Sequence, residues 1–146
     1  MFRLSNTGTL VRLLGLCCVM GSLAAAQAVQ KSEPEIVSWK NGISGLSCEH
    51  TKLKLDMMLT EGGADKTIII IARLGSGEFA RKLSRRRLQN LQGYLIEVRG
   101  VEGRRVVTAV GDRVKGPGQV EIYVGGELSL IFEMGRNKDF FSGCEW

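Results

Sequence analysis

Four consecutive isoleucines, Ile68 to Ile71, are the feature of this chain that most restricts how it can fold. β-Branched side chains favour strands, and an apolar run without alternation is typical of a strand that is covered on both faces. We therefore predict a central strand over residues 67–72. The segments on either side of this strand then decide the fold class.

A long amphipathic stretch follows the strand, after the turn Gly75-Ser76-Gly77. Its apolar side chains recur at three- and four-residue steps, which predicts a helix from about Glu78 to Arg99. These side chains are Phe79, Leu83, Leu91, Tyr94, Leu95 and Val98. Helix N-termini favour capping and acidic side chains, so we expect Ser76 to cap the helix and Glu78 to occupy its first turn.

A second apolar strand is predicted over residues 105–110. Strand, helix and strand in this order predict a βαβ unit with parallel strands. Alternating residues at 119–124 and 128–134, separated by Gly125-Gly126, predict a C-terminal β-hairpin. The predicted fold class is therefore α+β: a two-layer sandwich with a βαβ unit, a mixed sheet and a C-terminal hairpin.

Two further elements are predicted before the central strand. Residues 48–60 place Leu55, Met58 and Leu59 on one face of a helix, and Gly62-Gly63 provide a stop. Residues 36–39 form either a short strand or an arm that packs against the domain.

The first 28 residues have the features of a secretory signal peptide. The only charged residues before Lys31 are Arg3 and Arg12, an apolar run covers residues 13–20, and Ala26-Gln27-Ala28 fits an A-x-A cleavage pattern. We expect cleavage after Ala28. The alternative is an uncleaved membrane anchor, although the run is shorter than the about 20 residues that a span needs.

The predicted organisation is a signal peptide over residues 1–28, a flexible lead-in over 29–46 and a single domain over 47–146. Export places the chain in the periplasm or outside the cell, with no transmembrane segment after cleavage. Removing the signal leaves 18 basic and 15 acidic residues, a net charge of +3. This mildly basic charge does not indicate a nucleic-acid partner.

Cys48 and Cys144 are the only cysteines after the signal segment. Two cysteines in an oxidising compartment usually pair, so we predict a disulfide that links the first helix to the end of the chain. A metal site with His50 is the alternative, but the chain has neither a C-x-x-C pair nor a second histidine. We therefore predict neither a metal nor a cofactor.

The sequence contains no motif of an enzyme that we can assign. It lacks G-x-S-x-G, a P-loop and H-E-x-x-H, and its only histidine is His50. We therefore expect a protein without catalytic activity.

Residues 66–124 contain a series of short motifs in an informative order. Leu83-Ser84-Arg85-Arg86-Arg87 fits L-S-x-x-R on a helix, and Tyr94-Leu95 fits the end of that helix. Gly100-Val101 fits the connection, Val106 to Asp112 the next strand, and Gln119 to Ile122 a closing strand. In order and spacing, this region resembles the OmpA-like (peptidoglycan-associated) C-terminal domain family.

The resemblance implies an OmpA-like sandwich and a site for the diaminopimelate of peptidoglycan. Arg87 occupies the family's arginine position, whereas the aspartate position falls on Ala72 and the asparagine position on Ala80. The group that would receive the ligand's ammonium is therefore replaced. What remains is a candidate anion site made of Arg87, Arg73, Ser76 and Gly77.

These observations predict an exported, non-enzymatic binding or structural module of the bacterial cell envelope. Its expected partner is peptidoglycan or another anionic envelope component. The alternative interpretation is that the arginines form a solvated helix face and bind no ligand. A second function is a protein–protein adaptor that contacts another envelope protein. In that case Leu128 to Met134 would form an exposed edge strand able to pair with a partner.

Overall fold

The computed structural model describes residues 33–38, 47–62, 65–79, 81–141 and 144. All of them belong to the second of the two units into which the chain divides, residues 31–146. The predicted signal peptide, Trp39 and Ala80 lie outside the described residues. Within the described part of the chain, no helix has the length and apolar character needed to cross a membrane.

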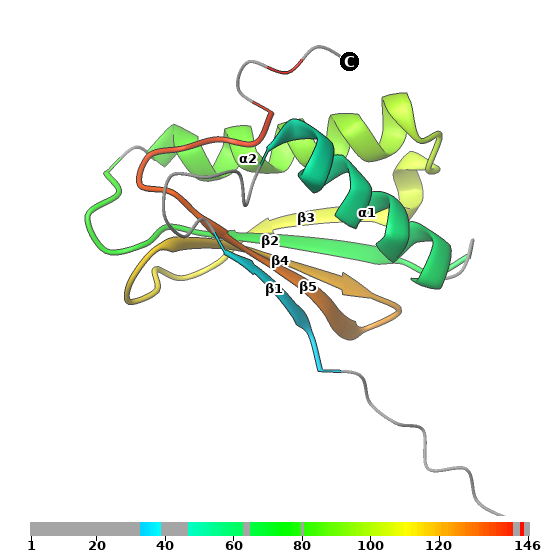
Figure 1. Cartoon of the computed structure of the whole chain (residues 1–146), viewed down its shortest axis with the longest axis horizontal. Helices are drawn as coiled ribbons and strands as arrows, with labels where there is room; N and C mark the ends of the chain where they lie inside the picture. Colours follow the sequence, from blue (N-terminus) through cyan, green and yellow to red (C-terminus); the bar gives the residue numbers. More distant parts are fainter. Residues whose placement is uncertain (1–32, 39–46, 63–64, 80, 142–143, 145–146) are drawn as a thin grey trace, which may run out of the picture. The chain divides into compact units, whose positions relative to one another are not determined.

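One five-stranded sheet forms the base of the domain, with the strand order β1-β5-β4-β2-β3 (Figure 1). The strands are β1 Glu35–Ser38, β2 Ile68–Arg73, β3 Val106–Val110, β4 Gly118–Val124 and β5 Glu127–Met134. β2 is parallel to β3 and antiparallel to β4, and β5 is antiparallel to β4 and parallel to β1. The isoleucine strand, the parallel strand pair and the C-terminal hairpin are confirmed. The expected cover on both faces of that strand is not, because Ile69 and Ile71 are only half-buried.

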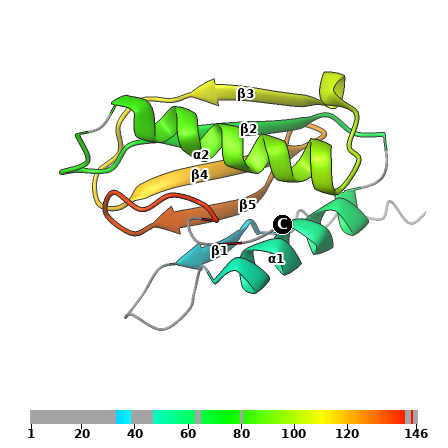
Figure 2. The ribbon, with the colours of Figure 1, turned by 90° about the horizontal axis from the view of Figure 1, so that it is seen from above.

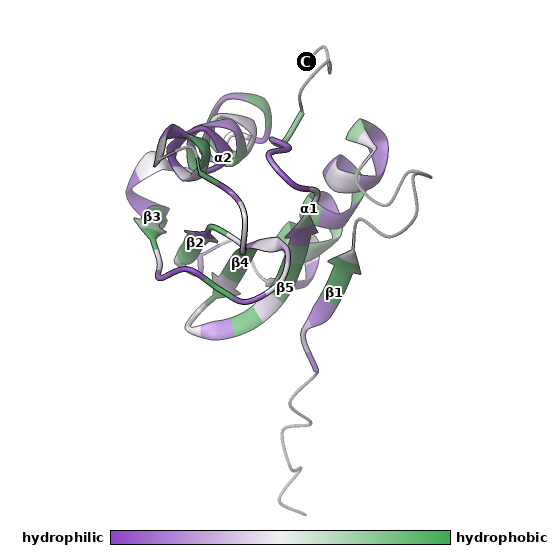
Figure 3. Cartoon of the chain, turned by 90° about the vertical axis from the view of Figure 1, so that its left-hand side faces the viewer, coloured by the Kyte–Doolittle hydropathy of each residue, from purple (hydrophilic) through white to green (hydrophobic). Residues whose placement is uncertain are grey.

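Both helices, α1 Cys48–Gly62 and α2 Arg81–Gly93, lie on the same side of the sheet (Figures 2 and 3). Alternate residues of the strands point toward the helices, as period-two geometry requires. The fully buried side chains between the layers include Ile70, Ile122, Phe132, Leu55, Leu91 and Leu95. The predicted α+β class and two-layer arrangement are therefore confirmed, while the other face of the sheet carries no helix among the described residues.

The second helix begins and ends differently from the prediction. It starts at Arg81, and after Gly93 it widens into a π-helical turn, η1 Tyr94–Val98. This turn closes where the Arg99 N–H donates to the Tyr94 carbonyl over 3.1 Å. The expected cap at Ser76 is wrong, because its hydroxyl bonds to Val114 and Gly116 instead. The apolar stripe is confirmed at Leu83, Leu91, Tyr94 and Leu95.

Phe79 was expected on that stripe, but its side chain is 80% exposed. It precedes the first helical turn, so helical periodicity does not apply to it. Val98, at the end of the π-helical turn, is 44% exposed because the wider turn rotates it away from the core.

The edges of the sheet are also different from those expected. β5 pairs with β4 on one side and β1 on the other, so the prediction of an exposed edge over Leu128 to Met134 is wrong. β1 lies in the segment predicted as a flexible lead-in, and it agrees with the short strand expected over residues 36–39. Among the strands that the structure describes, β1 and β3 lie at the two edges of the sheet.

A disulfide joins Cys48 and Cys144, as predicted, with their Cα atoms 5.9 Å apart. It fastens the first residue of α1 to the C-terminal segment across 96 positions of sequence. Closing a loop of this length reduces the entropy of the unfolded chain, so the bond stabilises the domain by up to about 4–5 kcal/mol in that account.

Candidate functional site

Arg87, the central residue of the predicted anion site, lies inside the protein. Its side chain is 0% exposed and forms a bidentate ion pair with Glu78, which is 1% exposed. Nη2 donates to Glu78 Oε1 over 2.6 Å and Nη1 donates to Oε2 over 3.1 Å. The anion that Arg87 holds is therefore a carboxylate of the chain itself.

The remaining bonds of this pair are made by the backbone. Arg87 Nε and Nη2 donate to the carbonyl of Lys138, while the Glu78 carboxylate accepts from the N–H groups of Gly75 and Asn137. Burial by itself raises the pKa of Glu78, but the bonds from Arg87 and Gly75 and the charge of Arg87 outweigh burial and lower it. The glutamate is thus held as a carboxylate, and an external anion reaches Arg87 only by displacing it.

This pair also explains a local requirement for glycine. A Cβ atom on Gly118 would lie 2.3 Å from Glu78 Oε2 and 2.6 Å from Arg87 Nη1. The strand β4 can therefore pass directly over the ion pair only because residue 118 has no side chain. Sequence reasoning placed Glu78 in the first turn of the helix; its role is to neutralise Arg87.

Ser76 and Gly77 lie on the turn before α2, next to the loop that precedes β4. Ser76 N–H donates to the carbonyl of Gly116 over 2.9 Å, and Gly77 adopts a φ of +81° that favours glycine. The Gly77 carbonyl accepts from Arg136 Nε over 3.2 Å. Arg113 Nη1 donates to the carbonyls of Gly75 and Glu78, over 2.6 Å each. The cations that contact this turn are therefore Arg136 and Arg113, and Arg87 lies behind Glu78.

Arg73, the other cation of the predicted site, lies on the helix-free face of the sheet. Its guanidinium bonds to both oxygens of Glu121 over 2.8 and 3.3 Å, and Tyr123 donates to the same carboxylate. The hydrogen bond to Glu121 is the main cause that raises the pKa of Arg73. The structure does not bring Arg73 together with Arg87, because they lie on opposite sides of the sheet.

The other basic residues of the segment 81–87 fit the interpretation of a solvated helix face. Lys82, Arg85 and Arg86 are exposed, and Arg86 pairs with Asp139 over 3.0 Å. The side chain of Arg81 lies outside what the structure describes. These residues therefore do not converge with Arg87.

A second polar cluster joins α1 to the π-helical turn. The Tyr94 hydroxyl donates to Asp56 Oδ1 over 2.9 Å, and Arg99 contacts both the Tyr94 hydroxyl and Asp56. Burial is the main cause that raises the pKa of Tyr94. These contacts hold the two helices at a fixed spacing on the sheet.

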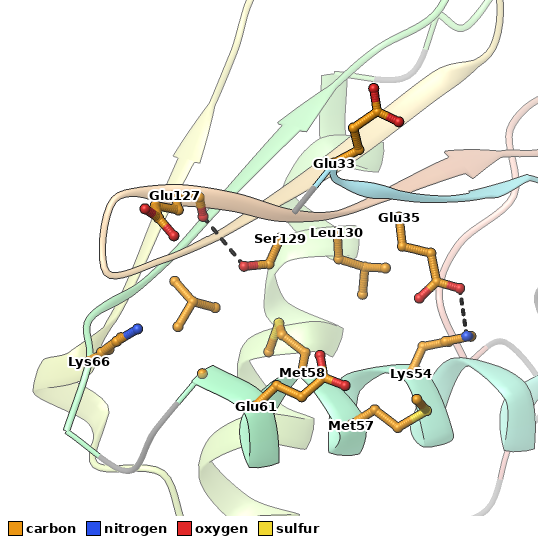
Figure 4. Close-up of a pocket in the computed structure, with 12 residues that line it drawn as sticks. Glu33, Glu35, Lys54, Met57, Met58, Glu61, Lys66, Glu127, Ser129 and Leu130 are labelled. Atoms are coloured by element: carbon orange, nitrogen blue, oxygen red, sulfur yellow. Dashed lines mark hydrogen bonds and ion pairs between the residues drawn. The ribbon is translucent and has the colours of Figure 1, made fainter. Parts of the chain in front are cut away.

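A hollow that combines charge with an apolar floor lies between α1, β1 and the β4–β5 turn (Figure 4). We call it the α1 pocket; it holds about 240 Å³. Val124, Met58 and Leu130 are buried to 6% exposure or less and form the floor. The charged lining residues are Glu33, Glu35, Glu61, Glu127, Lys54 and Lys66.

The charges of the α1 pocket are unevenly paired. Lys54 Nζ lies 2.5 Å from Glu35 Oε1, which neutralises one carboxylate and fixes Lys54 against β1. Three carboxylates and Lys66 remain around the hollow. Sequence reasoning missed this pocket because its acids are far apart in the chain, and the pairing of β1 with β5 is what brings Glu35 beside Leu130 at its rim.

The predicted metal alternative at Cys48 and His50 has no support in the described residues. Cys48 is in the disulfide, and the parts of the chain that the structure describes contain no cluster of three histidine, cysteine, aspartate or glutamate side chains arranged to hold a metal. The His50 backbone N–H donates to Ser47 Oγ at the start of α1.

Comparisons with known proteins gave no family model that matches the chain, and neither a curated protein nor a solved structure matched it. The resemblance to OmpA-like domains therefore stays a prediction from sequence motifs.

Proposed function

We propose that this chain is an exported, non-enzymatic binding module of the bacterial cell envelope, and that the α1 pocket holds its ligand. The ligand class is a primary ammonium group on a short aliphatic stem. The observation that carries the proposal is the excess of carboxylates around the apolar floor of this pocket. Such a floor accepts the stem while the rim accepts the charge.

The end of α1 adds to the negative character of the α1 pocket. Gly62 closes the helix and lines the pocket, and the last helical turn contains no basic residue. The carbonyl groups at a helix C-terminus carry partial negative charge and favour a cation. Glu61 lies in the same turn and lines the pocket. The carbonyl groups at the end of α1 and the Glu61 carboxylate therefore both attract the ammonium group.

Peptidoglycan is the source of the ammonium group that we favour. The OmpA-like resemblance implies recognition of diaminopimelate, whose amino group needs an acid. The family's aspartate position is Ala72 in this chain, and Ala72 is 0% exposed. In our proposal, the acids of the α1 pocket take over the recognition of the amino group, and Arg87 takes no part.

The test is a pull-down on purified peptidoglycan sacculi with three forms of the chain. We expect wild type to bind, and a variant combining Glu61→Gln with Glu127→Gln to bind about 3- to 10-fold less, as expected for two partly exposed charge contacts. A variant combining Glu49→Gln with Glu97→Gln removes the same charge from exposed positions outside the pocket and should bind like wild type.

Sacculi whose free amines have been acetylated provide the complementary control. We expect them to retain none of the wild-type chain above background. Equal binding to native and acetylated sacculi, or equal binding by both double variants, would refute the assignment of the ammonium group to the α1 pocket.

A second candidate function, protein–protein contact, is favoured by the helix-free face of the sheet. Ile36 on β1 is 60% exposed and Val107 on β3 is 47% exposed, and both point to that face. A photoreactive residue at Val107, with one at Glu49 as the control, would test this function in exporting cells. A discrete adduct at Val107 alone, larger than two copies of the chain, would indicate a different protein as partner.

A further inference from the structure

The edge strand β3 has the composition of a strand that pairs. It ends the sheet, with β2 as its only neighbour among the described strands. Its sequence, Val106-Val107-Thr108-Ala109-Val110, contains no charge and no proline. Val107 and Val110 are 47% and 59% exposed. Natural sheets usually protect an apolar edge with lysine, proline or a bulge, and β3 has none of these within its length.

The backbone of β3 presents hydrogen-bonding groups to the outside. Gly111 N–H donates to the carbonyl of Ala72, in the parallel register that pairs Ala72 with Val110. Backbone N–H and C=O groups point to alternate sides along a strand. Those of Val107 and Ala109 therefore point toward β2, and those of Thr108 and Val110 point away from it. The side of β3 that faces away from β2 thus presents the N–H and carbonyl of Thr108, the N–H of Val110 and the carbonyl of Val106.

The sequence of β3 is complementary to itself when read antiparallel. With Thr108 at the twofold axis, Val106 faces Val110 of the other copy, and Val107 faces Ala109. The pairing does not continue past the start of the strand, because Arg104 belongs to the 3-10 turn Gly103–Arg105 and pairs with Glu102 of its own copy over 2.7 Å.

We propose that two copies of this chain pair through β3, antiparallel about Thr108, to form one continuous ten-stranded sheet. The interface is isologous, because the same patch of each copy meets the other. Each copy contributes the hydrogen bonds of Thr108 and one bond between Val110 N–H and the Val106 carbonyl. Two five-residue edges bury little surface, so we expect a dissociation constant in the micromolar range or weaker. This inference does not depend on the α1 pocket.

Cysteine cross-linking tests the register. In the proposed pairing the two copies of Thr108 form a hydrogen-bonded pair with Cα atoms about 5.5 Å apart, a distance that a disulfide spans. Thr108→Cys should therefore give a disulfide-linked dimer on mild oxidation. Ala109→Cys is the matched control, because its two copies are offset diagonally and lie beyond easy bridging.

The outcomes of the cross-linking are distinct. Linkage at residue 108 well above that at residue 109, with none in wild type, supports the pairing. Equal linkage at both positions indicates random collision and overturns it. No linkage at residue 108, in a chain that still folds by circular dichroism, overturns it as well.

Sedimentation equilibrium tests the same interface without any cysteine. At concentrations up to several hundred micromolar, the wild-type chain should form dimers.

A lysine in the edge gives the last comparison. Ala109→Lys should weaken the dimer at least about tenfold, whereas Ile36→Lys on the opposite edge strand should leave it unchanged. A wild-type chain that remains monomeric at all concentrations, or equal effects of the two lysines, would overturn the proposal.

Discussion

Replacing Arg87 by methionine is the sharpest test of the role that the structure gives to this residue. Methionine keeps most of the side-chain volume, but the change removes two bonds to Glu78 and two to the Lys138 carbonyl. The Glu78 carboxylate then stays buried with only the N–H groups of Gly75 and Asn137. Removing one partner of a buried ion pair costs about 3–5 kcal/mol, so we expect a loss of this size in the free energy of unfolding.

The measurement is urea unfolding followed by circular dichroism, with Arg86→Met as the matched control. Arg86 is the preceding residue on the same helix, but its side chain is 57% exposed and it pairs with Asp139 at the surface. Exposed ion pairs contribute at most about 1 kcal/mol, so this variant should unfold close to wild type.

A double-mutant cycle with Glu78→Gln then measures the coupling. Because the two side chains neutralise each other, the combined loss should be smaller than the sum of the single losses by at least about 2 kcal/mol. Two results would contradict a stabilising role of the buried ion pair. One is that Arg87→Met is no more destabilising than Arg86→Met, and the other is that the losses from Glu78→Gln and Arg87→Met are additive. If Arg87→Met loses binding to sacculi while its free energy of unfolding is unchanged, Arg87 binds the ligand instead.

Three further predictions concern stability. Since the folded state lowers the pKa of Glu78 below its ordinary 4.5, the unfolded state binds the proton more readily. Stability is therefore complete above about pH 4.5 and falls below it, and Glu78→Gln should flatten that fall in unfolding titrations from pH 7 to 3. Gly118→Ala should destabilise the domain because the new Cβ atom meets the ion pair of Arg87 and Glu78. Gly93→Ala should stabilise the domain by about 0.5–1 kcal/mol, because Gly93 has a helical φ and open space around it. Thermal melts in which the Gly118 variant is the more stable of the two contradict this prediction. Cys48→Ser with Cys144→Ser should cost about 2–4 kcal/mol, and adding reductant to wild type should give the same shift in melting temperature.

Sequence reasoning predicted the fold where local pattern and tertiary structure agree. The isoleucine run of β2, the alternation in β4 and β5, and the Gly125-Gly126 turn each carry their own signal. The buried role of Arg87 carries no such signal, because an arginine on a basic helix face looks solvated until a distant carboxylate and the carbonyl of Lys138 enclose it. The α1 pocket was unpredictable for a related reason: β1 pairs with the strand most distant from it in sequence.

The edge assignment failed through the same long-range pairing. Hydrophobic alternation indicates that residues 128–134 form a half-buried strand, but it does not indicate how many neighbours that strand has. Four residues of β1 pair with β5 and take its place at that end of the sheet. At the other end, β3 is the edge of the described sheet although its sequence suits an internal strand.

The C-terminal segment that carries Asn137, Lys138 and Cys144 has a consequence for how the chain is made. These residues complete the ion pair and the disulfide, and they are synthesised after every helix and strand described. Arg87 therefore lacks part of its partner set until this segment has been synthesised. The described domain reaches its full stability only once residues 137, 138 and 144 are in place.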